Sequence, residues 1–217
     1  MTSEFNDFRI WHSENALMQV VKALKKRDFD AEYFPDAAGA NEALLKVIPE
    51  KATVGIGGSV TVRELRIIGQ LEKRGNEVTH HWKPEATKET NREIRKKEGT
   101  ADYYLTSANA ITEQGDVINI DGIGNRVAHM IYGPDNVIIV AGYNKIVPDI
   151  DSGVRRSREI AGVINAKRVG AKTPCAETGN CVNCNAPGRI CRVTTIMQYR
   201  PWQTNIKVIL VNEILGY

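Results

Sequence analysis

Short apolar runs alternate along this chain with segments whose apolar residues recur every three or four positions. The runs Thr53–Ile56 and Val137–Val140 have the continuous apolar character of strands that are buried on both faces of a parallel sheet. Helical patterns lie between such runs, including a long one that starts at Asp149 or Asp151 and reaches Arg168. This alternation predicts an α/β protein with a mostly parallel sheet flanked by helices.

Capping sequences predict where two of the helices start. Ser13 is a suitable N-cap for the first helix. Thr61 and Glu64 have the T-x-x-E spacing of a capping box, which predicts a helix that starts there and runs through Arg74.

Two extended runs flank a short polar turn in the middle of the chain. The runs Ala110–Thr112 and Val117–Ile120 are separated by Glu-Gln-Gly-Asp, which predicts a β-hairpin. Glu113 in this turn and Asp121 after the second run are the carboxylates that we consider for acid–base catalysis.

Composition and charge exclude several classes of protein. The chain has 217 residues, of which 42% are hydrophobic and 25% are charged, as expected for one globular domain over residues 1–217. Its net charge of +3 is too balanced to indicate a nucleic-acid partner. No stretch approaches the roughly 20 apolar residues of a membrane helix, and the N-terminus lacks the pattern of a signal peptide. We therefore expect a cytoplasmic protein.

The charge is unevenly distributed along the chain. From Lys145 onward, 11 Lys and Arg stand against 5 Asp and Glu, whereas 18 stand against 21 before it. A solvated basic helix face would explain this excess, and so would an anionic partner or prosthetic group.

A glycine-containing loop follows the first buried run. Gly57, Gly58, Ser59 and Thr61 lie between a strand and a helix, where an open α/β sheet usually binds its ligand. Glycines let backbone N–H groups approach an anion, and the helix N-terminus adds a partial positive charge. The loop has neither the P-loop nor the dinucleotide-binding pattern. It predicts an anion or phosphate site, and a tight turn without a ligand is the alternative.

Two further polar loops follow predicted strands. They contribute the candidate ligand-binding residues Thr106, Ser107 and Asn109 in the first loop and Gly122, Gly124, Asn125 and Arg126 in the second. An arginine in such a loop can bind a carboxylate or phosphate with two hydrogen bonds. Because the ends of parallel strands meet at one edge of a sheet, we expect these loops to converge with the glycine loop. Each loop is also a good turn sequence in its own right.

The histidines are expected to have structural roles. His80 and His81 lie at the end of a strand pattern, where adjacent side chains point to opposite faces, so the two cannot easily bind one metal. We expect the same of His12 and His129.

All four cysteines fall within one short segment near the C-terminus. Cys175, Cys181, Cys184 and Cys191 form a C-x5-C-x2-C-x6-C pattern within the cysteine-rich loop 172–192. Disulfides are disfavoured in a chain without an export signal, so the pattern predicts one metal centre, either zinc or an iron–sulfur cluster such as [4Fe–4S]. Lys172, Arg189 and Arg192 would offset its negative charge. Free or disulfide-forming thiols are the alternative.

The chain resembles the LUD family, the lactate-utilisation domain, in four blocks that occur in the order found in that family. These blocks are Gly55–Leu65, Thr106–Gly115, Asn119–Ala128 and Gly142–Val147. The last block adds Asn144 and Lys145 to the candidate ligand-binding residues. The cysteine segment also looks like the C-terminal extension of small stand-alone members.

This resemblance implies both a fold and a role. The implied fold is related to glucosamine-phosphate isomerase, ribose-phosphate isomerase and coenzyme A transferases. The implied role is in the bacterial oxidation of L-lactate to pyruvate, where LUD proteins act beside iron–sulfur subunits. The ferredoxin-type cysteine repeats of larger members are absent from this sequence.

Three functions follow from these observations. The first is an accessory redox protein that binds a small anion and carries a metal cluster, with iron–sulfur subunits as partners. The second is an isomerase or acyl transferase acting on a sugar phosphate or a coenzyme A thioester. The third is a zinc-stapled assembly module without catalysis. The sequence leaves open whether the protein is a homo-oligomer.

Overall fold

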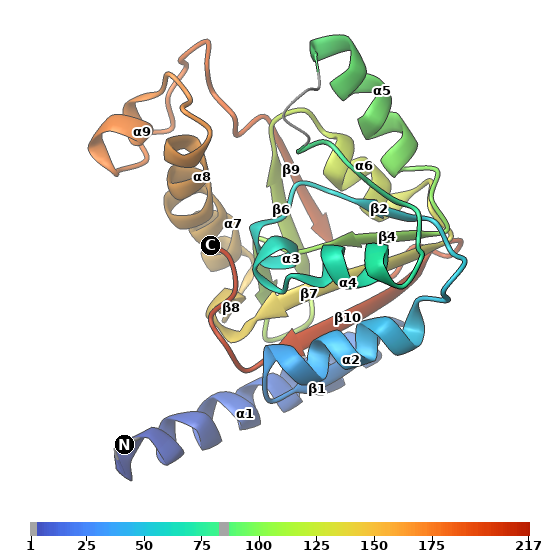
Figure 1. Cartoon of the computed structure of the whole chain (residues 1–217). Coiled ribbons are helices and arrows are strands. Elements are labelled where there is room, and N and C mark those ends of the chain that lie inside the picture. Colours follow the sequence, from blue (N-terminus) through green and yellow to red (C-terminus); the bar gives the residue numbers. More distant parts are fainter. Residues whose placement is uncertain (1–3, 83–86) are drawn as a thin grey trace.

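A six-stranded parallel sheet forms the centre of the protein, whose computed structural model describes residues 4–82 and 87–217 (Figure 1). Every neighbouring pair of strands is parallel, so the predicted α/β architecture is confirmed. In spatial order the strands are β1 (Asp30–Phe34), β10 (Asn205–Val211), β7 (Asn136–Gly142), β4 (Tyr103–Thr106), β2 (Val54–Ile56) and β3 (Val78–His80).

Side chains of the central strand β7 alternate between two hydrophobic layers. Ile139 and Ala141 pack in the layer that includes Leu17 and Val20 of helix α1 (Glu4–Lys25). On the other face, Ile138 and Val140 pack in the layer formed with helices α2 (Ala37–Val47), α3 (Val60–Glu64) and α4 (Ile67–Lys73). Burial on both faces explains why this strand is an uninterrupted apolar run.

A second, four-stranded sheet lies beside the first. Its order is β8 (Ile146–Val147), β5 (Ala110–Thr112), β6 (Val117–Asp121) and β9 (Val193–Met197). Strands β5 and β6 are antiparallel, which confirms the predicted hairpin. The loop after β6 therefore leaves the second sheet, and our expectation that all three polar loops follow strands of one parallel sheet was wrong.

Two predicted helix starts were also wrong. Ser13 lies inside α1, where its hydroxyl donates to backbone carbonyls of the preceding turn. The cap of α3 is Ser59, whose Oγ accepts from the N–H of Val62, so the capping box at Thr61 does not form. Arg66 adopts a left-handed conformation with φ of 54°, which divides the predicted helix into α3 and α4.

The predicted long helix after Asp149 forms, and its middle is wider than an α-helix. Asp149 is its N-cap, and it consists of α7 (Ile150–Arg156), the π-helical segment η2 (Ser157–Gly162) and α8 (Val163–Arg168). Such π segments are often found at functional sites. The other helices are α5 (Lys88–Glu98), α6 (Asn125–Ile131), the short 3₁₀ helix η1 (Tyr143–Lys145) and α9 (Pro174–Thr178). Figure 1 shows α7 and α8 in line, with α9 at the far end of α8.

No helix within residues 4–82 and 87–217 combines the length and the apolar character that crossing a bilayer requires.

Close backbone packing at Gly55 provides a test of this core. A methyl group on Gly55 would overlap the carbonyl of Glu98, whereas one on Gly69 in α4 would meet nothing within 4 Å. We expect Gly55→Ala to lower the free energy of unfolding by about 1–3 kcal/mol, because the backbone must shift. Gly69→Ala should raise it by up to about 1 kcal/mol through helix propensity. Guanidinium denaturation of both variants would measure the changes, and equal stabilities would contradict the packing at β2.

Candidate functional site

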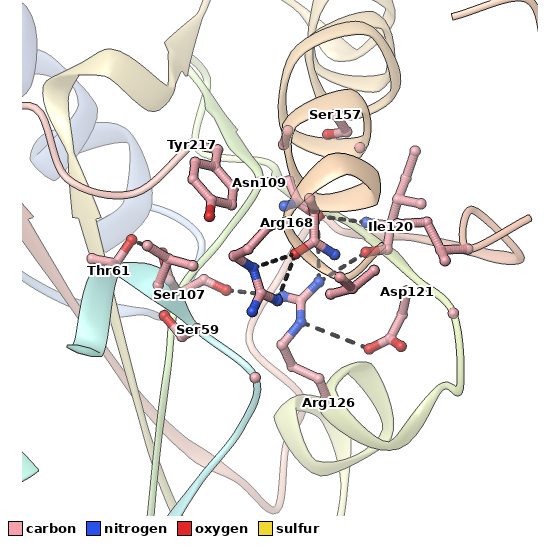
Figure 2. A pocket seen from close by; sticks show the side chains of 18 of the residues that line it. Ser59, Thr61, Ser107, Asn109, Ile120, Asp121, Arg126, Ser157, Arg168 and Tyr217 are labelled. Atoms are coloured by element: carbon pink, nitrogen blue, oxygen red, sulfur yellow. Dashed lines mark hydrogen bonds and ion pairs between the residues drawn. The ribbon is translucent and has the colours of Figure 1, made fainter. Parts of the chain in front are cut away.

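A cavity of about 280 Å³ lies at the carboxyl ends of the central strands, between the two sheets and the π-helical segment (Figure 2). Loops after β2, β4, β6 and β7 contribute to its walls, together with η2 and α8. The cavity brings together most of the predicted site residues: Gly58, Ser59, Thr61, Ser107, Asn109, Asp121, Gly122, Asn125, Arg126 and Lys145.

Five predicted site residues do not line this cavity. Gly57 packs against the hydroxyl of Tyr104, and Gly124 is the left-handed N-cap of α6. Thr106 is fully buried, and the amide of Asn144 binds backbone groups of the C-terminal segment. Glu113 is exposed at the turn between β5 and β6, outside the cavity.

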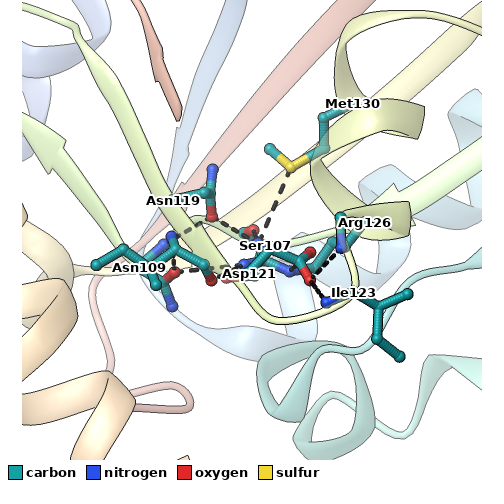
Figure 3. A network of polar contacts seen from close by, with 9 residues as sticks. Ser107, Asn109, Asn119, Asp121, Ile123, Arg126 and Met130 are labelled. Carbon is teal, nitrogen blue, oxygen red and sulfur yellow. Dashed lines mark hydrogen bonds and ion pairs between the residues drawn. The ribbon is translucent and has the colours of Figure 1, made fainter. Parts of the chain in front are cut away.

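The Arg126 guanidinium is surrounded by acceptors of the protein itself (Figure 3). Its Nη1 donates to Ser107 O at 3.1 Å and to Asn119 Oδ1 at 2.6 Å. Its Nη2 donates to Asn109 Oδ1 at 3.3 Å and to Ile120 O at 2.9 Å. All four Nη protons are therefore used within the fold. Arg126 brings positive charge to the cavity, but its main contacts hold the loops together.

Asp121 is similarly committed to the fold. Its Oδ1 accepts from the backbone N–H groups of Ile123 and Gly124 at 3.0 and 2.9 Å. Its Oδ2 lies 3.7 Å from Arg126 Nε. Burial lowers the pKa of Arg126, and the nearby Asp121 charge opposes this shift. This carboxylate therefore fixes the start of α6 and balances the buried guanidinium.

Lys145 is a buried lysine whose hydrogen-bond partners are two hydroxyl groups. It is 3% exposed, and its Nζ donates to Thr61 Oγ1 and Ser107 Oγ, both at 2.8 Å. Within the described part of the chain, its ammonium group has no ion-pair partner. Burial lowers its pKa to about 7, with smaller contributions from Arg156 and Arg126 that the Glu64 charge opposes.

His81 belongs to the cavity wall, which the sequence did not indicate. Its Nδ1 lies 2.7 Å from Oε1 of Glu98, whose side chain is fully buried. The imidazole also lies beside Gly58. We had expected a structural role for His81; the structure adds that its imidazole is oriented by a carboxylate at the cavity, an arrangement used for proton transfer in enzymes. Its partner lies 17 residues away in another element, so no local pattern could have revealed the pair.

The cavity walls carry an excess of positive charge. Besides Arg126 and Lys145, they include three arginines that the sequence reasoning had not selected, namely Arg63, Arg95 and Arg168, whereas Asp121 is the one Asp or Glu among the described lining residues. An anionic partner was one of the two explanations for the basic C-terminal third, and Arg168 comes from that part of the chain. This charge balance favours an anion as the occupant.

A second, smaller cavity is lined by all four cysteines: Cys175, Cys181, Cys184 and Cys191. The cysteines are half-buried free thiols. Arg189 holds the loop in shape, because its guanidinium donates to the backbone carbonyls of Cys184 at 2.6 Å and Cys191 at 2.7 Å. Ile190 and Cys191 line both cavities, so the two share a wall.

The thiols are close enough to influence one another electrostatically. Burial raises the pKa of Cys191, the other three cysteines raise it further, and Arg189 opposes them. Within residues 4–82 and 87–217, however, no three His, Cys, Asp or Glu side chains are arranged to hold a metal ion directly. The four cysteines therefore line one cavity, but their side chains are not arranged as the ligands of one metal ion in the described part of the chain.

The buried amine of Lys145 gives stability a characteristic pH dependence. The folded-state pKa of about 7 lies below the ordinary value of 10.5, so between these pH values the unfolded chain binds a proton that the folded chain does not. Wild-type stability should therefore rise from pH 7 to pH 10 by roughly 2–4 kcal/mol more than that of Lys145→Met. Guanidinium denaturation under reducing conditions would measure both. Lys167→Met, at an exposed position of α8, should keep the wild-type slope. Parallel pH profiles for wild type and Lys145→Met would contradict the burial of a lowered-pKa amine.

Comparison with known proteins places the chain in a family. The model of the LUD domain matches residues 17–211. A solved structure of a DUF162 family protein from Deinococcus radiodurans is similar in fold, with a TM-score of 0.51 and 17% sequence identity over 92% of this chain and 98% of that one. A search of curated proteins finds no match. Because the family model covers most of the sequence, including every lining loop up to Cys191, this chain belongs to the LUD domain family.

Proposed function

We propose that this LUD protein binds a small organic anion of the 2-hydroxy or 2-oxo acid class in the larger cavity, and that its cysteine segment holds a metal centre. In this proposal the protein is an accessory redox component of bacterial lactate use. The observation that carries it is the wall shared by the two cavities, formed by Ile190 and Cys191. A metal centre on the cysteines would lie next to the bound anion.

Size and charge support a small anion. The volume of about 280 Å³ is near the lower end of ligand pockets, which span about 300–1,000 Å³. Arg63, Arg95 and Arg168 add to the charge of the buried Arg126. The lactate class follows from the resemblance to the lactate-utilisation family, and the charge alone would suit any small carboxylate or phosphate.

The chemistry of the donor set supports a metal centre on the cysteines. Four thiols and two guanidinium groups, those of Arg158 and Arg189, line one small cavity. Cations at this position would offset the negative charge of metal-bound thiolates. The thiols are half-buried, with Cys175 in the short helix α9 and the other three in the segment that follows it. An iron–sulfur cluster held by Cys175, Cys181, Cys184 and Cys191 would supply one-electron transfer beside the anion.

The isomerase or acyl-transferase alternative gains less support. Both reactions would use a carboxylate free to act in the cavity. Glu113 lies outside it, and Asp121 is bound to two backbone N–H groups and faces Arg126. The redox proposal accounts for the cysteine cavity, which the transferase alternative does not use.

The anion site is tested by calorimetric titration with L-lactate and pyruvate. Arg168→Gln should weaken binding about fivefold, because one partly solvated charge contact near the anion is worth about 1 kcal/mol. Lys167→Gln is the matched control, since it removes the same charge from the neighbouring exposed position, outside the cavity lining. An equal loss of affinity in both variants would indicate general electrostatic attraction rather than a binding site. If the wild-type protein binds neither acid, the proposed ligand class is overturned.

The metal centre is tested by purification and reconstitution without oxygen, followed by iron, sulfide and zinc analysis. We expect iron and sulfide in comparable amounts, and we expect Cys191→Ser to lose most of both. Ser13→Ala, in the exposed part of α1, is a control that should retain them. Zinc without iron or sulfide would instead support the zinc-stapled module and would contradict the redox role.

A further inference from the structure

We propose that Lys145 is a nucleophilic amine that condenses with the carbonyl carbon of a 2-oxo acid in the larger cavity, forming an imine. The inference rests on the proposed function, because it requires a 2-oxo acid to bind there. It deepens that function by naming the atom that the bound carbonyl meets.

Three separate parts of the chain position the Lys145 amine. Lys145 ends the 3₁₀ helix η1 directly after the central strand β7. Its Nζ reaches Thr61 of α3 and Ser107 of the loop after β4, at 2.8 Å from each hydroxyl oxygen. In Figure 2 these two residues lie side by side on one wall of the cavity. The side chain is therefore held at the cavity wall from two directions.

The surroundings of the amine disfavour its protonated form. Lys145 is buried, Arg156 and Arg126 repel an ammonium ion at this position, and Glu64 attracts it. Burial and neighbouring cations are the two devices by which enzymes keep a lysine unprotonated and nucleophilic. Burial lowers the pKa of Lys145 to about 7, so its amine loses its proton far more readily than that of an exposed lysine.

Lys207 in β10 provides an internal contrast. Its Nζ lies 2.7 Å from a carboxylate oxygen of Asp30 and 2.7 Å from one of Glu32. Hydrogen bonds to these carboxylates raise the pKa of Lys207 against the effect of burial. The fold thus stabilises the ammonium form of Lys207 with carboxylates but offers Lys145 hydroxyl groups.

The hydroxyl groups beside Lys145 suit the proton transfers of imine formation. Attack of the Nζ lone pair on the carbonyl carbon forms the C–N bond and places the electron pair on oxygen. Two protons, both from the amine nitrogen, then move to that oxygen, and the C–O bond breaks to release water. The Oγ of Ser107 lies 3.2 Å from the Oγ1 of Thr61, and these two hydroxyl groups can relay the protons. The reaction joins amine and ketone with loss of one water and needs no oxidant.

The charge of the cavity argues for a carbonyl compound that also carries a carboxylate. Arg63, Arg95 and Arg168 belong to the same lining as Lys145. These arginines would attract the carboxylate of such a compound. A neutral ketone has no negative group for them to bind. A 2-oxo acid supplies both the electrophilic carbon and the anion, and pyruvate is the smallest stable example with a ketone.

The test is reductive trapping with sodium borohydride in the presence of pyruvate, followed by peptide mass spectrometry. We expect the reduced adduct on Lys145 of the wild-type protein and its loss in Lys145→Arg. Lys207→Arg, the matched control, should keep the adduct on Lys145. Acetone, which lacks the carboxylate, should give a much weaker adduct. Circular dichroism and thermal melting establish whether each variant is folded. If Lys145→Arg does not fold, the peptide map of the wild-type protein still shows whether the adduct is on Lys145.

Calorimetry with pyruvate separates the two levels of the proposal. Pyruvate binding without a Lys145 adduct would overturn the nucleophilic role and leave the anion site intact. Absence of both binding and adduct would overturn the inference together with the proposed function. Adducts spread over exposed lysines such as Lys167, with none on Lys145, would also overturn it.

Discussion

The buried guanidinium of Arg126 is the interaction on which the rest of the site depends. It belongs to α6, yet its acceptors lie in the loop after β4 and in strand β6 of the second sheet. Removing a cation from water costs several kcal/mol unless its hydrogen bonds are replaced. The loops must therefore keep their positions for the cation to be tolerated, and the cavity that they enclose is formed before any ligand binds.

This arrangement divides the polar groups of the cavity into two kinds. Arg126 and Asp121 are occupied by contacts within the protein, so they shape the site. Lys145 differs from both, because its Nζ is bound by hydroxyl groups, and the imidazole of His81 is oriented at the cavity by the carboxylate of Glu98. A positively charged lining around an amine and an imidazole is better suited to a small anion than to a large apolar ligand.

The sequence was most informative where the physics is local. Continuous apolar runs identified β2 and β7, because strands buried on both faces have no polar face to interrupt the pattern. The hairpin of β5 and β6 was predicted, but its pairing with β8 and β9 into a second sheet was not, because β8 has only two residues and β9 lies far away in the sequence. The shift of the α3 cap from Thr61 to Ser59 has a similar cause, since both residues satisfy the local capping rule and packing decides between them.

The site was partly predictable for the same reason. Strand-end loops rich in Ser, Asn and Gly identified Ser107 and Asn109, and the family resemblance identified Lys145, but neither gave the partners that determine the roles of these residues. The pairing of His81 with Glu98, and the isolation of Lys145 from carboxylates, depend on which distant segments the fold brings together. The family resemblance was specific enough to identify the LUD domain, and the chemistry of its cavity had to be found from the arrangement of side chains.

The π-helical segment between α7 and α8 has a consequence for how the two cavities are joined. A wide turn accommodates one more residue than an α-helical turn, so the residues beyond it are rotated by about 100° relative to an uninterrupted helix. Arg168 faces the larger cavity from beyond that segment, and Gly162 within it packs against the sulfur of Cys191. The extra residue therefore rotates α8 relative to α7. This rotation lets Arg168 face the larger cavity, while Gly162 leaves room for the thiol of Cys191 on the wall shared with the cysteine cavity.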